Sequence, residues 1–326
     1  MYPSSETKEV IAPVPNGGLR EESLSASARF ELSASARFEQ SASARFELSV
    51  SLLADDHIDE VMNFLAERPV HTFGLAGFIR NNGIDSPFNR GVFYGCRDRA
   101  GRLVGVALIG HFILFEARSE EAIEALARMA QTHKRVHMLL GEQEEVQTFW
   151  RYYHGGGQSP RLSCREMLFE LRWPIEGTEP VPGLRLATPA DLEMIVPVHA
   201  RTAFDESGIN PLDVDPEGFR ERCARRIANE QTWVLVENGQ LIFKAEIVSE
   251  TAQVIYLEGI DVNPEYRGRG YGSRCVSQLT GGLLGRTESI AVLINENNTG
   301  AVGFYRRSGF ELIGYYDTIF LESSHR

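Results

Sequence analysis

The residues best suited to chemistry lie in the stretch NPEYRGRGYGSRC, residues 263–275. Gly268, Gly270 and Gly272 alternate there with larger residues, directly after an apolar run. Glycines between a strand and a helix allow positive φ angles and let an anion approach the backbone closely. The first amides of a helix and its dipole favour such an anion. The stretch is thus an anion-binding loop, a plain turn or an arginine-glycine tract for nucleic acid.

The spacing of these glycines differs from that of the common nucleotide-binding loops. A P-loop ends in GKS or GKT, and neither occurs in this stretch. The GxGxxG pattern requires a third glycine where this chain has Ser273. If the loop binds an anion, the ligand therefore differs from the nucleotides that P-loops and GxGxxG loops bind.

A second pattern begins 28 residues beyond Gly270 and reads NTGAVGFYRRSGF. Asn298, Ala301 and Tyr305 are three and four residues apart, so a helix would place them on one face. Ala301 is small and leaves room beside the two polar side chains.

Together, the R-x-x-G-x-G pattern at 267–272 and this second pattern at 298–310 resemble the GNAT acetyltransferase superfamily. The resemblance extends over roughly 184–322. The stretches FDESGINP, LIFKAEI and NENNTGAVGFYRRSGF also resemble an actinobacterial-type two-domain group whose N-terminal half is a domain of unknown function. The resemblance implies acetyl-CoA as acyl donor. It also implies the α/β class with a mixed sheet (α+β), as tandem GNAT-like acyl-CoA acyltransferase folds.

The resemblance also implies roles for individual residues. Backbone groups of residues 260–262 would pair with the pantetheine arm like an extra strand, and the amides of residues 267–273 would hold the pyrophosphate. Asn298 would hydrogen-bond the cofactor. The implied cofactor-binding residues are Ile260, Asp261, Val262, Arg267, Gly268, Arg269, Gly270, Tyr271, Gly272, Ser273 and Asn298.

Tyr305 would lie near the sulfur and protonate the departing thiolate. A thiol has a pKa of about 8.5 and a tyrosine of about 10, so a positioned tyrosine can supply this proton. Read from the residues alone, Tyr305 is instead a core tyrosine, and Asn298 is an ordinary helix cap.

Transfer to an amine also needs a base, because an ammonium ion cannot attack. The candidates are Glu258 and Glu246. Glu258 precedes Ile260 by two residues on the same strand face, and burial would raise its pKa. Glu246 is alternatively an ion-pair partner of Lys244 or an arginine. A chain of water molecules in place of one base is the third possibility.

Two similar series of elements surround these motifs. The segment PIEGTEPVPG is rich in proline and glycine and is typical of a linker. We expect a degenerate GNAT-like domain over 45–175, a linker over 176–183 and a catalytic GNAT domain over 184–326. The run RLVGVALIGHFILFE is expected to be one strand, GLRLAT another, and FELIGYYDTIFL the closing strands.

The first copy lacks the glycine loop. The corresponding junction reads FILFEARSEEAIEAL, where Glu116, Glu120 and Glu121 would repel a pyrophosphate. We therefore expect this copy to pack against the second and to form a wall of its acceptor site, or to bind a regulator.

Three SASARFE repeats near the N-terminus alternate apolar and polar residues, as a half-buried strand does. We expect the last copy to lead into a strand over 45–53 and residues 1–44 to be a poorly ordered tail.

The composition narrows the function further. The chain has 326 residues, 43% hydrophobic and 24% charged, with a net charge of −12. This acidity argues against a nucleic-acid or membrane partner, and no apolar run reaches the length of a membrane span. Cys96, Cys164, Cys223 and Cys275 are far apart, so we expect a cytoplasmic protein without a metal site.

These observations predict an N-acetyltransferase that moves an acetyl group from acetyl-CoA to the primary amine of a small molecule. The amine would attack directly in a ternary complex, in a monomer or a homodimer. From residue 176 onward the chain has 22 acidic and 14 basic residues, which mildly favours a cationic acceptor. The alternative is a CoA-binding sensor or scaffold without turnover.

Overall fold

The computed structural model describes residues 48–175, 177 and 179–322. These residues contain one mixed sheet of twelve strands, in the order β1-β2-β3-β4-β5-β12-β6-β11-β10-β9-β8-β7. The strands are β1 (Ser49–Leu52), β2 (Gly91–Arg97), β3 (Leu103–Gly110), β4 (Phe112–Ala117), β5 (Met138–Glu142), β6 (Pro160–Leu171), β7 (Arg185–Leu186), β8 (Thr232–Glu237), β9 (Gln240–Glu250), β10 (Val254–Val262), β11 (Ser289–Asn295) and β12 (Glu311–Leu321).

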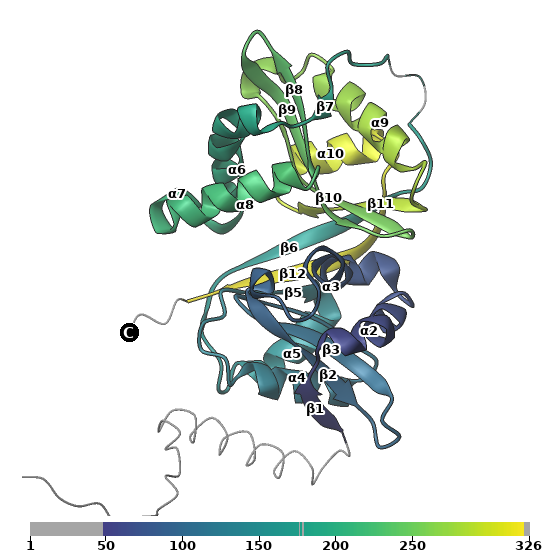
Figure 1. Cartoon of the computed structure of the whole chain (residues 1–326), viewed down its shortest axis with the longest axis vertical. Coiled ribbons are helices and arrows are strands. Elements are labelled where there is room, and N and C mark those ends of the chain that lie inside the picture. Colours follow the sequence, from purple (N-terminus) through teal and green to yellow (C-terminus); the bar gives the residue numbers. More distant parts are fainter. Residues whose placement is uncertain (1–47, 176, 178, 323–326) are drawn as a thin grey trace, which may run out of the picture.

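Helices cover both faces of this sheet (Figure 1). The α-helices are α2 (Ile58–Leu65), α3 (Pro69–Asn82), α4 (Glu120–Ala130), α5 (Gln143–Tyr153), α6 (Leu192–Ser207), α7 (Pro211–Val214), α8 (Pro216–Ala228), α9 (Tyr271–Leu283) and α10 (Thr299–Arg307). Short 3-10 helices are η1 (Asp55–His57), η2 (Pro87–Asn89), η3 (Pro189–Asp191) and η4 (Pro264–Tyr266). Among the described helices, none combines the length and apolar character that crossing a membrane requires.

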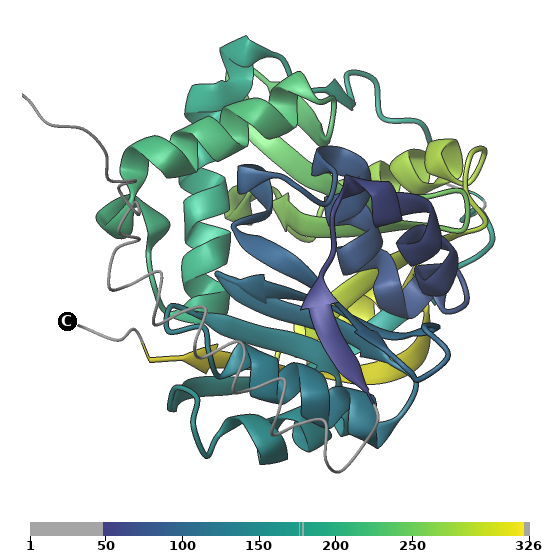
Figure 2. The same ribbon diagram turned by 60° about the horizontal axis from the view of Figure 1, so that its bottom comes forward.

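The sheet consists of two similar halves that exchange a strand. β1 to β5 lie in order on one side and β11 to β7 in the mirrored order on the other. Between them, β12 pairs with β5 of the N-terminal half, and β6 pairs with β11 of the C-terminal half. Figures 1 and 2 show yellow β12 among the strands of the N-terminal lobe.

The exchange extends to the hydrophobic cores. Ile319 and Leu321 of β12 pack into the core of the N-terminal half, beside α4 and α5. Phe169 and Leu171 of β6 pack into the core of the C-terminal half, beside α9 and α10. Each half therefore depends on the other for part of its core.

The N-terminal half also reaches the C-terminal sheet through α3. Phe73 stacks on Tyr256 of β10 with ring centroids 4.0 Å apart, and Asn81 donates to the carbonyl of Val248 at 3.2 Å. A Cβ on Gly77 would lie 2.6 Å from Cβ of Ser249, so only glycine permits this close approach. α3 thus covers part of β9 and β10.

Three expectations about strands need correction. RLVGVALIGHFILFE is two strands, β3 and β4, which turn at Gly110 and His111 and pair antiparallel. Both strands are largely buried, so apolar residues lie on both sides of the turn. The hydrophobic pattern of the sequence therefore does not show where one strand ends and the next begins. FELIGYYDTIFL is the single strand β12, and GLRLAT contributes only the two residues of β7.

At the N-terminus, the expected strand over 45–53 corresponds to β1 within the described residues. The SASARFE repeats and the expected tail over 1–44 lie outside the described residues.

Candidate functional site

Two adjacent parallel strands of the C-terminal half separate toward their carboxyl ends. β10 pairs with β11 only from Val254 to Tyr256, although β10 continues to Val262 and β11 to Asn295. On its other side, β10 pairs with β9 as far as Val262. The edge of β10 from Leu257 onward that faces β11 therefore has no strand partner within the described sheet.

β10 also bulges where it leaves β11. Glu258 lies opposite Glu246 and Asp261 lies opposite Lys244, so two residues of β10 face one residue of β9. Gly259 within the bulge has a φ of +58°, and a Cβ there would lie 2.9 Å from Nζ of Lys244. A bulge interrupts the hydrogen-bond ladder and redirects the strand. The bulge includes Ile260, the first of the three residues that were predicted to bind pantetheine through their backbone.

The glycine loop joins β10 to the N-terminus of α9. Gly268 and Gly270 have φ angles of +74° and +80°, a conformation that favours glycine. Gly270 is the N-cap of α9 and provides no side-chain cap. In the described structure, the amides from Gly268 to Ser273 donate no hydrogen bond to the protein. These unpaired amides and the helix dipole suit an anion, as the sequence predicts.

The side chain of Arg267 forms hydrogen bonds with the last residues of β10. Its Nε donates to the carbonyl of Val262 at 2.9 Å, and its Nη2 donates to Asp261 at 3.3 Å. The second carboxylate oxygen of Asp261 accepts a hydrogen bond from Arg201 of α6 at 2.8 Å. Two further predicted residues of the loop contact neighbouring side chains. Arg269 is exposed, and its guanidinium carbon lies 5.3 Å from the centroid of the Tyr266 ring. Tyr271 is half-buried and donates a hydrogen bond to Glu237.

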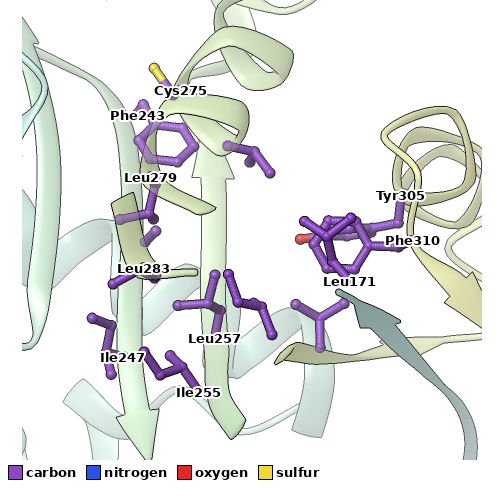
Figure 3. Close-up of a cluster of buried hydrophobic side chains, with 14 of the residues drawn as sticks. Leu171, Phe243, Ile247, Ile255, Leu257, Cys275, Leu279, Leu283, Tyr305 and Phe310 are labelled. Carbon is purple, nitrogen blue, oxygen red and sulfur yellow. The ribbon is translucent and has the colours of Figure 1, made fainter. Parts of the chain in front are cut away.

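Asn298 and Tyr305 lie at the two ends of α10. Asn298 is the N-cap, and its side chain accepts from the amide of Ala301 at 3.1 Å, so the structure shows the helix-cap role. Tyr305 is 4% exposed and packs against Phe310 and Leu171 on the face of the sheet that α9 and α10 cover. In Figure 3 its hydroxyl points away from α10 toward the strand of Leu257. Burial raises the pKa of Tyr305, so the hydroxyl keeps its proton at neutral pH.

The two predicted carboxylates differ in their surroundings. Glu246 is 1% exposed and pairs with Lys244 at 3.0 Å, with His199 at 2.9 Å and with Arg226. Burial opposes its ionisation, but these three partners, above all Lys244 and Arg226, outweigh burial and hold the pKa of Glu246 well below its ordinary value. Glu258, its cross-strand neighbour, is half-buried and has no ion pair among the described residues. Glu258 is therefore better placed than Glu246 to accept a proton.

The corresponding junction of the N-terminal half lacks these features. β4 pairs with β3 without a register shift, so it has no bulge. Ser119 caps α4 by accepting from the amide of Ala122 at 3.3 Å, and Glu120 and Glu121 occupy the first turn. A side-chain cap and two carboxylates thus stand where the other half has a glycine loop.

The sequence of the C-terminal half matches a known family. Residues 200–310 match the model of the acetyltransferase (GNAT) family. The C-terminal half therefore carries a GNAT acetyltransferase domain. No curated protein matches the chain.

Solved structures show that the GNAT fold extends to both halves. A GNAT-family acetyltransferase from Colwellia psychrerythraea is 13% identical, with a TM-score of 0.55, over 85% of this chain and 100% of its own. A tandem GNAT protein from the clavulanic acid biosynthesis pathway gives the same identity and TM-score over 86% and 100%. A Drosophila protein, also 13% identical, has a TM-score of 0.61 over 85% and 99%. The expected tandem GNAT-like fold with a mixed sheet is thus confirmed.

The structure adds two carboxylates that sequence reasoning missed. Glu206, at the end of α6, and Glu166, on the exchanged strand β6, are close enough to Glu258 of the GNAT domain for their charges to interact. Glu206 lies in FDESGINP, but no spacing in that stretch marks it as functional. Nothing in the sequence signals Glu166, because it reaches the GNAT domain only through the strand exchange.

Proposed function

We propose that the GNAT domain is an acetyl-CoA-dependent N-acetyltransferase that acts on the primary amine of a small molecule. The observation that carries this proposal is the separation of β10 from β11, with a loop of unpaired amides at one end and Tyr305 beside it. The unpaired edge at residues 260–262 would take the pantetheine arm like a strand. The amides of residues 267–273 would hold the pyrophosphate, and Asn298 would hydrogen-bond the cofactor through its amide NH2 group.

The proposed reaction is a direct attack within a ternary complex. The amine nitrogen attacks the thioester carbonyl, a C–N bond forms, and the C–S bond breaks with its electron pair moving to sulfur. Tyr305 gives its proton to the departing thiolate, which the retained proton of this buried hydroxyl supports. A base takes the proton that the amine loses.

Glu258 is the base that we propose for this step. It lies beside the bulge, on the strand edge where the thioester would be held, and has no described ion-pair partner. Glu246 would be a poor base, because Lys244 and Arg226 stabilise its ionised form and His199 lies within hydrogen-bond distance of it. We assign Glu246 the role of holding Lys244, Arg226 and His199 in place.

For the rest of the chain, we propose that residues 45–175 form a degenerate copy that does not bind CoA. Its α3 and β6 would instead complete the acceptor side of the catalytic copy over 184–326, with 176–183 as the linker. In this proposal the protein works in the cytoplasm as a monomer or homodimer.

Titration of the full chain with acetyl-CoA tests the first part of this proposal, and saturable binding is expected. Release of free CoA thiol with a panel of primary amines tests the second part. No saturable binding would overturn the assignment. Binding without thiol release from any amine would favour a CoA-binding sensor or scaffold.

A further inference from the structure

A buried lysine of β9 contacts the backbone of the bulge in β10. Lys244 is 1% exposed, and its Nζ donates to the carbonyl of Gly259 at 3.3 Å. A Cβ on Gly259 would lie 2.9 Å from the same Nζ, and the φ of this residue is +58°. A larger residue at this position would therefore displace the lysine ammonium from the carbonyl.

This contact defines the orientation of one peptide group. Lys244 lies on the face of the sheet that α6 and α8 cover, since Glu246, two residues further along β9, contacts both helices. The carbonyl of Gly259 is turned toward that face. In a planar trans peptide the C=O and the following N–H point in opposite directions. The amide of Ile260 therefore points away from Lys244, and Ile260 is the first residue of the proposed pantetheine site.

Lys244 is itself held by a buried carboxylate. Its Nζ lies 3.0 Å from Oε1 of Glu246, which is also 1% exposed. Nδ1 of His199 lies 2.9 Å from the same oxygen, and Nη1 of Arg226 contacts the other oxygen. Polar contacts therefore run without a break from α6 and α8, through the carboxylate and the lysine, to the carbonyl of Gly259.

The other end of the bulge is held from the same helix. Asp261 lies opposite Lys244 in the strand register, and it accepts a hydrogen bond from Arg201 of α6 at 2.8 Å. A bulge interrupts the hydrogen-bond ladder, so the ladder alone does not define its shape. Side chains that contact the bulge at both ends supply this definition.

The energetic cost of burying Lys244 is a further argument for such a role. Lysine is almost never fully buried unless it is paired, and Glu246 provides the pair. Removal of both charges from water is costly, however, and an apolar pair of similar volume is often equally stable or more stable. Stability alone therefore does not account for a buried lysine here, whereas the hydrogen bond to Gly259 gives the ammonium a specific task.

We infer that Lys244 is a positioning residue of the acetyl-CoA site, because it holds the peptide between Gly259 and Ile260 in the orientation that binds the pantetheine arm. This inference rests on the proposed acetyltransferase function. Lys244 is buried, so it acts through the bulge. Its removal should weaken binding of the pantetheine arm and leave binding of the pyrophosphate by residues 267–273 intact.

Two ligands separate these effects on the full chain. Acetyl-CoA contains the pantetheine arm, and 3′-phosphoadenosine 5′-diphosphate is the remainder of the molecule without it. Isothermal titration up to millimolar ligand gives a Kd for each. In Lys244→Met, which keeps an unbranched side chain but has no donor, the Kd for acetyl-CoA should rise by on the order of tenfold, as expected for one lost hydrogen bond from a charged group. The Kd for the diphosphate should stay within about twofold.

Arg226→Met is the matched control. It also removes one of the two cations that contact Glu246 and introduces the same side chain, but it lies on α8 and leaves the hydrogen bond to Gly259 in place. Both variants should be less stable to urea, and only Lys244→Met should raise the ratio of the acetyl-CoA Kd to the diphosphate Kd. If Lys244→Met does not fold, Lys244→Gln replaces it, because glutamine keeps a donor for Glu246 on a side chain that is one bond shorter.

The two possible failures are distinguishable. An unchanged ratio in the folded lysine variant, or an equal rise in both variants, would overturn the inference and leave the proposed function standing. Absence of acetyl-CoA binding by the unsubstituted protein would overturn both.

Discussion

Arg201 of α6 donates a hydrogen bond to Asp261 of β10, with 2.8 Å between Nη2 and Oδ2. The other oxygen of the same carboxylate accepts from Arg267 of the glycine loop at 3.3 Å. One side chain thus links the helix on the proposed acceptor side to the loop on the proposed cofactor side. The proposed binding of pantetheine uses only the backbone of Asp261, which makes the role of its side chain testable.

Asp261→Asn should change the Kd for acetyl-CoA by no more than about threefold, because the substitution keeps the backbone and an acceptor oxygen. Isothermal titration measures this. Glu265→Gln in the adjacent 3-10 helix removes an equal charge from the same surface and serves as control. A tenfold loss in Asp261→Asn alone would show that the carboxylate itself takes part in binding.

Gly270→Glu should abolish saturable acetyl-CoA binding, because it places a carboxylate at the N-terminus of α9 beside the unpaired amides. Gly101→Glu is the matched control: Gly101 has a φ of +77°, its Cβ would also meet open space, and it lies in the N-terminal half. Both substitutions force a left-handed conformation that costs about 1 kcal/mol or more. If both variants bind acetyl-CoA equally, the loop is not the pyrophosphate site.

Tyr305→Phe should lower kcat by about a hundredfold, the range of lost general-acid catalysis, while the Kd for acetyl-CoA stays within about threefold. Tyr153→Phe, which alters a buried tyrosine at the end of α5, should leave kcat within about twofold. Single-turnover kinetics with a saturating amine make the comparison. An unchanged kcat in Tyr305→Phe would identify Tyr305 as a core residue only.

Glu246→Gln should lower the free energy of unfolding by about 3 kcal/mol, because it leaves Lys244, 1% exposed, without its anion. Glu250→Gln, which breaks the exposed pair with Arg286, should cost less than about 1 kcal/mol. Urea denaturation followed by circular dichroism measures both.

The pH dependence of this effect follows from the lowered pKa of Glu246. A carboxyl whose folded pKa is depressed stabilises the protein fully above its unfolded pKa of about 4.3, and the contribution is lost as the pH falls below that value. The difference between the unsubstituted protein and Glu246→Gln should therefore shrink below about pH 4. A difference that is constant from pH 7 to pH 3 would contradict the ion-pair assignment.

A fragment of residues 184–326 should aggregate or unfold non-cooperatively, because it lacks β6 and leaves the edges of β11 and β12 unpaired. A fragment of residues 158–326 retains β6 and should be more soluble and melt more cooperatively. Gel filtration and thermal denaturation compare the two. A stable, monomeric 184–326 fragment would show that the exchange is dispensable.

The glycine loop was predictable because its chemistry depends on neighbours in sequence. Gly268 and Gly270 must stand between a strand and a helix, and the alternation of residues there shows this without long-range information. The same holds for α10, whose cap at Asn298 is set by local backbone geometry. Local requirements of this kind are visible in a single sequence.

The strand exchange was not predictable, because a period-two pattern defines which face of a strand is buried but not which strand it pairs with. β6 and β12 show the same apolar alternation whether they complete their own half or the other one. The proximity of Glu166 to Glu258 depends on that pairing, so the two residues could not be associated before the sheet order was known. The pairing of Glu246 with Lys244 and an arginine, by contrast, was an alternative that the sequence offered and the structure shows.

The position of β12 also bears on how the chain folds during synthesis. β12 follows every other described strand in the chain, yet it lies in the middle of the sheet between β5 and β6. During synthesis, the edge of β5 that pairs with β12 stays unpaired until the ribosome has added about 170 further residues and β12 begins. The nascent N-terminal half would then be an unfinished sheet with an exposed apolar edge, which is the kind of surface that chaperones bind.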